Sequence, residues 1–170
     1  MNHLTIGKEL SLNGNLFKSM LTGIPKERYL WKPEPEKWCL LEIICHLYDE
    51  EKEDFRTRIR LIFENPECDF PPIDPAGWVT SHDYIHQDYE GMIDQFWQER
   101  QHSVLWLKSL EREDWQKSGK HPHYGFMTAQ ELSCNWLGHD YLHIRQVTRL
   151  KYDHLRELNK TSLDYAGNWI

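Results

Sequence analysis

Apolar residues recur every three or four positions along four long stretches of the chain, which is the pattern of amphipathic α-helices. These stretches cover residues 5–21, 39–64, 81–110 and 128–150. Each would bury one apolar face against the others, since a helix with a single apolar face needs a partner that covers it. We therefore expect an all-α protein, a four-helix bundle with long loops, in which residues 1–170 form a single domain.

Capping and turn-forming residues mark the ends of these helices. Gly23 and Pro25 end the first one. The fourth begins with a capping box, in which Thr128 and Glu131 satisfy each other's backbone N–H groups. After residue 150 we expect one short helix near residues 154–159. No segment is predicted to form a strand.

Two loops separate the helices and are expected to form the walls of a site. Residues 65–79 carry four prolines and a glycine, which we take to exclude a regular element there, and residues 116–127 form the second loop. In the second helix most of the charged residues are predicted to face solvent. They are Glu50, Glu51, Lys52, Glu53, Asp54, Arg56, Arg58 and Arg60.

Composition narrows the class of protein. Hydrophobic residues make up 39% and charged residues 28% of the 170 residues, as in ordinary globular domains. The net charge of −7 and the absence of a basic cluster argue against a nucleic-acid partner. No apolar run is long enough to cross a bilayer, and the N-terminus has no signal-peptide pattern. We expect a cytoplasmic protein without a membrane partner.

The four cysteines show neither a CxxC spacing nor a disulfide framework. Cys39, Cys45 and Cys134 lie in apolar helical stretches, so we predict that they are buried and reduced. Reduced cysteines agree with a cytoplasmic location.

Three histidines are the main candidates for chemistry. His139 and His143 lie four residues apart in the fourth predicted helix, so their side chains share one face, and apolar neighbours turn that face toward the core. His46 lies among apolar residues of the second helix. Three imidazoles from two facing helices could hold one metal ion and leave coordination positions open. The alternative is three core histidines that hydrogen-bond to the backbone or to one another.

His82 and His86 repeat the same spacing. They fall at the first turn of the third predicted helix, among polar residues, so we expect them near solvent. His121 and His123 flank a proline in the second loop, where they could line the mouth of a site, although ordinary loop residues would look the same.

Three segments resemble the DinB-like superfamily of metal-binding four-helix bundles. They are KWCLLEIICHL at residues 37–47, HYGFMTAQEL at 123–132 and GHDYLHIRQ at 138–146. The resemblance covers nearly the whole chain, and the order and spacing of the segments make it more specific than any one of them. It departs at Cys39, where relatives commonly carry a Ser or Thr helix cap.

The resemblance implies one divalent metal ion, such as Zn, Ni or Fe, held by His46, His139 and His143. It also implies a small-molecule substrate, such as a low-molecular-weight thiol, because relatives include bacillithiol- and mycothiol-dependent enzymes. Relatives are often dimers, so the resemblance also implies a homodimer. A metal lowers the pKa of a bound thiol or water, so a thiol transferase and a hydrolase both remain open. A third alternative is a stress-related protein that binds a metal or ligand without turnover.

Neighbours of the three histidines supply further candidates. Asp49 and Glu50 follow His46 by three and four residues, so either could orient an imidazole or act as a general base. Asp49 and Glu50 could equally well be ordinary solvent-facing residues of the charged outer face. Asp140 points away from its neighbour His139 and is predicted to pair with another helix.

Three more residues are candidates for the pocket beside the metal. Trp78 and Tyr124 supply aromatic side chains from the two loops, and Gln146 lies one helical turn after His143.

Overall fold

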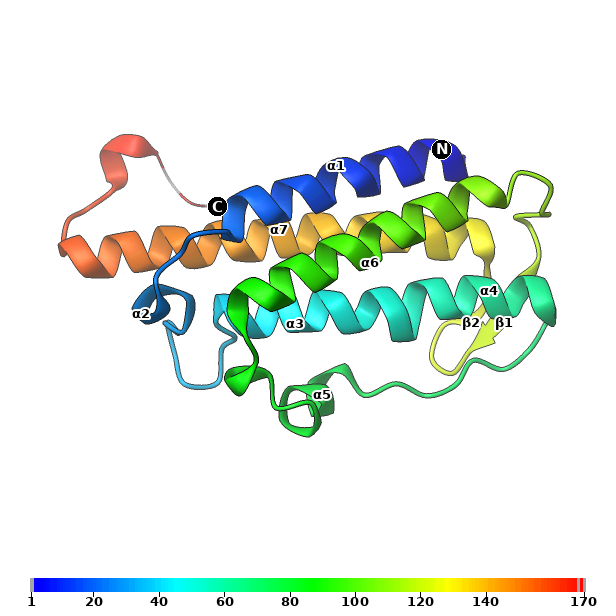
Figure 1. The fold of residues 1–170 in the computed structure, drawn as a ribbon, viewed down its shortest axis with the longest axis horizontal. Helices are drawn as coiled ribbons and strands as arrows, with labels where there is room; N and C mark the ends of the chain where they lie inside the picture. The colour runs from blue at the N-terminus through cyan, green and yellow to red at the C-terminus, as the bar shows by residue number, and fades with distance from the viewer. Residues whose placement is uncertain (1, 168, 170) are drawn as a thin grey trace.

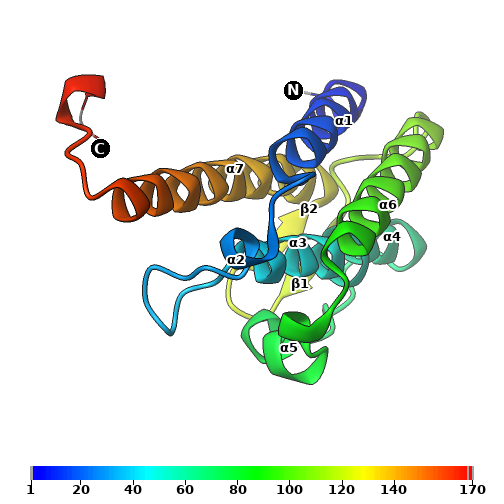
Figure 2. The same cartoon turned by 60° about the vertical axis from the view of Figure 1, so that its left-hand side comes forward.

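A computed structural model of the chain describes residues 2–167 and 169. Four long helical stretches lie side by side as a bundle, which confirms the predicted fold class (Figure 1). They are α1 (His3–Leu21), the stretch from α3 (Leu40–Asp49) to α4 (Arg56–Glu64), α6 (Tyr89–Ser109) and α7 (Ala129–Asn159). The C-terminal part of α7 extends beyond the other helices (Figure 2).

The second stretch is one continuous helix with a π-helical segment, η1 (Glu50–Phe55), between α3 and α4. A π turn holds an extra residue and therefore shifts the faces of the helix that follows. Glu50, Glu51, Asp54 and Arg58 of this continuous helix are buried. The prediction that most of this charged run faces solvent was wrong for these four residues.

The third helix is shorter than predicted. A left-handed backbone at Asp83 (φ 49°) separates α5 (Pro75–Ser81) from the 3₁₀ turn η2 (Tyr84–His86), and extended backbone at Gln87 then separates η2 from α6. The prolines did not exclude a helix at α5, because Pro75 occupies its first turn, where no N–H is needed. The Asp74 side chain caps this helix by accepting from the Gly77 N–H at 2.9 Å.

The second loop contains an antiparallel hairpin of β1 (Ser118–His121) and β2 (Gly125–Thr128), which the prediction missed. Gly125 turns the chain with φ +72°. The capping box at Thr128 is confirmed, and α7 runs on through the short helix expected at 154–159. Two further short helices are α2 (Lys26–Tyr29) and η3 (Asp164–Ala166).

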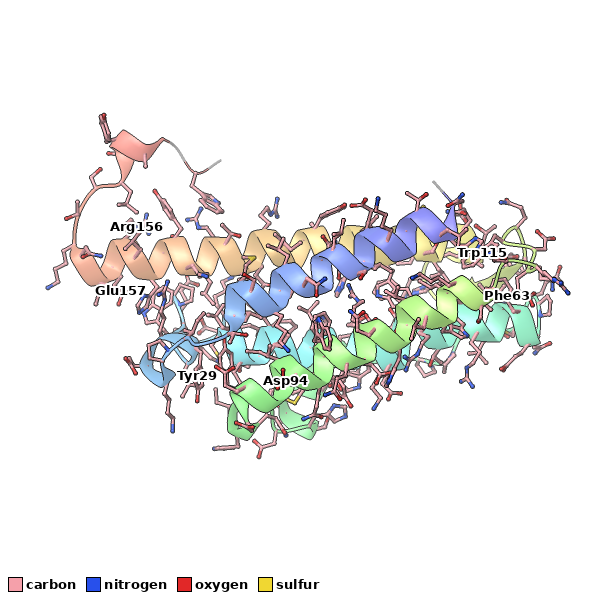
Figure 3. The ribbon with its side chains drawn as sticks, turned by 45° about the horizontal axis from the view of Figure 1, so that its top comes forward. Tyr29, Phe63, Asp94, Trp115, Arg156 and Glu157 are labelled. Atoms are coloured by element: carbon pink, nitrogen blue, oxygen red, sulfur yellow. The ribbon has the colours of Figure 1, made fainter. Side chains whose placement is uncertain are left out.

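Two apolar clusters form the core, one toward each end of the bundle. The first includes Phe17, Leu41, Ile44, Phe96 and Val147, and the second includes Ile6, Leu10, Ile59, Leu107 and Trp136. Phe63 and Trp115 meet edge to face, with ring centroids 5.3 Å apart, at the end of the bundle where α1 begins (Figure 3).

A buried ionic network joins the four helices near the middle of the bundle. Arg100 of α6 is 1% exposed and donates two hydrogen bonds to Asp140 of α7, at 2.6 and 2.8 Å. It also donates to Glu51 of η1 at 2.9 Å and to the Leu10 carbonyl of α1 at 3.0 Å. The predicted pairing of Asp140 with a neighbouring helix is confirmed.

The cysteines are all free, but one lies elsewhere than predicted. Cys39 and Cys45 are buried, as expected. Cys134 is exposed on the outer face of α7, so the prediction of its burial was wrong. Among the described residues, no helix combines the length and apolar character that crossing a membrane requires.

Candidate metal centre

Three imidazoles converge between α3 and α7. The Nε2 atom of His139 lies 3.3 Å from Nε2 of His46 and 3.0 Å from Nε2 of His143. One ring nitrogen from each residue lies within 4.8 Å of those of the other two. In the part of the chain that the structure describes, this is the one group of three or more such side chains spaced for a metal ion.

Hydrogen bonding leaves nitrogen lone pairs at the centre of this triad. His143 Nδ1 lies 2.7 Å from Gln146 Oε1, and because a carbonyl oxygen accepts, the ring proton of neutral His143 is on Nδ1. Its Nε2 therefore presents a lone pair to His139. A neutral His139 has at most one Nε2 proton for its two neighbours, so at least one of the two contacts is left without a proton between its nitrogens. A metal ion that prefers nitrogen ligands fits this set of donors.

Burial keeps the three histidines neutral. Loss of hydration, reinforced by the neighbouring imidazoles, lowers the pKa of His46 to about 3 and that of His139 to about 2. Burial also lowers the pKa of His143. Neutral imidazole is the form that binds metals, so the site needs no deprotonation at neutral pH.

Glu50 lies next to the triad, as the sequence suggested. Its Oε1 is 4.0 Å from Nδ1 of His46, an atom that is buried and has no hydrogen-bond partner among the described residues. Burial, with the nearby Asp54 carboxylate, raises the pKa of Glu50 to about 8. Glu50 is therefore the neighbouring carboxyl group that could accept a hydrogen bond from His46 Nδ1 if the two side chains moved closer. Its raised pKa also lets it hold a proton of its own.

Asp54 and Arg58 were missed as residues of this region. Asp54 Oδ1 lies 2.6 Å from Arg58 Nε, and both side chains are buried. Their i, i+4 spacing, in register with Glu50, was the available signal. The prediction of a solvated outer face concealed it.

A pocket of about 490 Å³ opens beside His139, between α7, the η1–α4 segment and the hairpin. We call it the apolar pocket. It is lined by Asp54, Phe55, Arg58, His121, Tyr124, Met127, Leu132, Asn135, Gly138, His139 and Leu142. The predicted pocket residue Tyr124 lies here. His121 is at the pocket wall, whereas His123 is absent from the lining.

A second pocket of about 410 Å³ opens on the other side of the triad. We call it the Trp38 pocket. It is lined by Glu36, Lys37, Trp38, His46, His143 and Gln146. The predicted pocket residue Gln146 lies here. The apolar pocket therefore meets the triad at His139, and the Trp38 pocket meets it at His46 and His143.

Two residues predicted near the metal lie elsewhere. Asp49 accepts hydrogen bonds from Tyr84 Oη at 2.6 Å and from His82 Nδ1 at 2.7 Å, on the side of α3 that faces η2. Trp78 stacks on His82, with ring centroids 5.9 Å apart. His82 and His86 themselves are exposed, which confirms their predicted place near solvent.

Comparisons with known proteins agree on the fold. The family model described as the DinB superfamily matches residues 9–147. Among solved structures, YfiT from Bacillus subtilis is similar with a TM-score of 0.78 and 16% identity over 87% of this chain and 85% of that one. That protein is described as a probable metal-dependent hydrolase with an unusual four-helix bundle topology. No curated protein matches the chain.

Proposed function

The chain belongs to the DinB superfamily, and we propose that it is a divalent-metal-dependent enzyme acting on small molecules. His46, His139 and His143 are the proposed metal ligands. The observation that carries the proposal is the convergence of three neutral imidazoles without a fourth His, Cys, Asp or Glu ligand among the described residues. A site with three protein ligands leaves positions open for water or substrate, as catalytic metal sites do.

Hydrolysis is the reaction that we favour. A bound metal supplies an activated water at neutral pH, because it lowers the pKa of that water. Gln146 holds the His143 ring and its tautomer through the 2.7 Å hydrogen bond. Glu50 is the proposed proton carrier, since its raised pKa lets it hold or release a proton near neutral pH. The hydrolase description of YfiT supports this choice by analogy of fold.

Thiol transfer is the second candidate. A metal also lowers the pKa of a thiol, and the two hollows on either side of the triad offer separate room for a thiol and its acceptor. Both reactions depend on the same three ligands. A protein that binds metal without turnover depends on them as well, so metal binding is the first property to test.

The first experiment measures the metal content of purified protein by elemental analysis. We expect about one divalent ion per chain and its loss in His46→Ala, His139→Ala and His143→Ala. His82→Ala and His86→Ala are matched controls, because that pair has the same spacing but lies exposed. Full metal content in all three triad variants would sink the proposal. The same analysis identifies the metal as Zn, Ni, Fe or another ion.

The second experiment separates the reactions. Metal-loaded and metal-free protein are assayed with simple esters and amides, and then with a low-molecular-weight thiol and an electrophile. Metal-dependent hydrolysis without thiol supports the hydrolase, and activity that requires thiol supports the transferase. Bound metal with no turnover in either assay contradicts the proposed enzyme and supports a binding protein.

A further inference from the structure

Gly138 lies inside α7, and the packing of the bundle does not require a glycine at this position. Glycine at such a position costs about 1 kcal/mol relative to alanine. At Gly14 of α1, an added Cβ would lie 2.9 Å from Arg100 Cγ, so close helix packing explains that glycine. At Gly138, an added Cβ would meet no heavy atom within 4 Å in the described part of the chain. The space beside Gly138 is therefore open.

This space belongs to the apolar pocket and adjoins the triad. Gly138 precedes His139 on α7, and both line the pocket. Phe55 forms part of the wall, with its ring centroid 5.3 Å from that of His139. Met127 of the hairpin and Leu142 of α7 extend the apolar surface. A ligand in this pocket would rest its apolar part on these side chains and reach His139.

The charged groups in the wall are already paired. Arg58 Nε lies 2.6 Å from Asp54 Oδ1, and the guanidinium also lies 5.3 Å from the centre of the Phe70 ring. His121 Nδ1 accepts hydrogen bonds from two backbone N–H groups of the hairpin turn, at 3.1 and 3.3 Å. Burial and the Arg58 charge lower the pKa of His121, so it is neutral at pH 7. Because Asp54 and Arg58 already offset each other's charge, a charged ligand would lose its hydration here with little electrostatic gain.

We infer that the apolar pocket takes the aromatic or branched alkyl group of an uncharged small molecule, and that Gly138 sets the size of the group that fits. The inference rests on the proposed function, in which the polar end of the same molecule reaches the metal. The pocket volume of about 490 Å³ lies within the range of small-molecule sites.

Two methionines provide a local test. Met127 lines the apolar pocket, whereas Met92 lines a separate hollow beside Tyr84. The full-length protein, labelled with ¹³C at its methionine methyl groups, is titrated with phenylacetamide, both as purified and after treatment with a chelator. We expect a saturable NMR shift of the Met127 methyl group and none at Met92. Phenylacetate and 2-phenylethylamine carry one charge each and should bind at least about tenfold more weakly.

Substitutions at Gly138 test its role. Gly138→Phe should abolish the Met127 shift, and Gly138→Leu, with its better helix propensity, should weaken or abolish it. Gly138→Ala is the matched control and should leave binding within about twofold, because a methyl group occupies little of the pocket. Thr148→Phe adds the same ring at an exposed position of α7 and should have no effect. Circular dichroism verifies that each variant is folded.

Three results would overturn the inference. They are no Met127 shift in the unsubstituted protein, an undiminished shift in folded Gly138→Phe or Gly138→Leu, and equal binding of the charged probes. The titration after chelation needs no bound metal, so its outcome is independent of the metal analysis. Loss of the proposed function therefore shows in the metal content, and failure of this inference shows at Met127.

Discussion

His143 donates a hydrogen bond from Nδ1 to Gln146 Oε1 over 2.7 Å, one turn further along α7. The bond fixes both the orientation of the imidazole and the nitrogen that carries its proton. As a consequence, Nε2 of His143 faces Nε2 of His139 at 3.0 Å with its lone pair. Gln146 thus acts on the proposed metal through His143.

Replacing Gln146 should weaken metal binding without removing a ligand. We expect Gln146→Ala to lower the affinity by about 10- to 100-fold, since partners that orient a ligand contribute about that much. Gln146→Glu keeps an acceptor oxygen and should retain affinity. Competition with a chromophoric chelator measures both. Arg145→Ala, at an exposed neighbouring position, is the control. Unchanged affinity in Gln146→Ala would refute this role of the hydrogen bond.

The buried ionic network should respond unequally to loss of its members. Arg100→Met leaves the Asp140 and Glu51 carboxylates buried without their cation, so we expect a loss of at least about 3–5 kcal/mol in the free energy of unfolding. Asp140→Asn leaves Arg100 paired with Glu51 and should cost only about 1–3 kcal/mol. Urea unfolding monitored by circular dichroism gives both values. The opposite order would show that Arg100 is not the centre of the network.

Two glycines on different helices should respond to alanine in opposite directions. Gly14→Ala forces a Cβ to within 2.9 Å of Arg100 Cγ, and the hydrogen bonds of Arg100 prevent it from moving away. We expect a loss of about 1–3 kcal/mol in stability. Gly138→Ala meets no described atom within 4 Å and should gain up to about 1 kcal/mol. Thermal unfolding measures the pair, and equal shifts would contradict the difference in packing.

The stability of the metal-free protein should fall in acid because of the triad. The pKa values of His46 and His139 drop from 6.5 in the unfolded chain to about 3 and about 2 in the fold. At pH values between the folded and the unfolded pKa, the unfolded state binds more protons than the folded state. The free energy of unfolding therefore decreases as pH falls below about 6.5. Metal affinity should fall in the same direction, because protons compete for the imidazoles.

Glu50 should act in the opposite sense. Its pKa rises from 4.5 in the unfolded chain to about 8 in the fold, so its contribution is complete below pH 4.5 and disappears as pH rises toward 8. Glu50→Gln should remove this part of the pH dependence and leave the acid loss from the histidines. Melting temperatures of metal-free protein from pH 4 to 9 test both effects. A Glu50→Gln profile that coincides with the original one would contradict the raised pKa.

Local patterns were sufficient for much of the fold and for identifying the three histidines that converge. The apolar period of 3.6 located the bundle helices, and the Thr128–Glu131 capping box located the start of α7. The i, i+4 spacing placed His139 and His143 on one face, and the polar neighbours of His82 and His86 indicated the exposed pair. The apolar neighbours of His46 in the second helix made it the third candidate, and the resemblance to a family supported that choice.

The surroundings of the site could not be predicted in the same way. The hairpin strands are only four residues long and carry no clear alternation. Its spacing from His46 made Asp49 a candidate to orient an imidazole or act as a general base. Its observed partners, Tyr84 and His82, come from a segment more than thirty residues away. Such contacts depend on how loops return to the bundle, which a local pattern does not contain.

By itself, the sequence determined the helical bundle and the histidines that meet in it, because helical periodicity and i, i+4 spacing are properties of neighbouring residues. Only the tertiary structure decided which charges are buried. Glu50, Glu51 and Asp54 lie inward along the π-helical segment, and Arg100 reaches Glu51 and Asp140 from another helix. Burial of a charge depends on partners brought together from distant parts of the chain, so it emerges only when the helices pack.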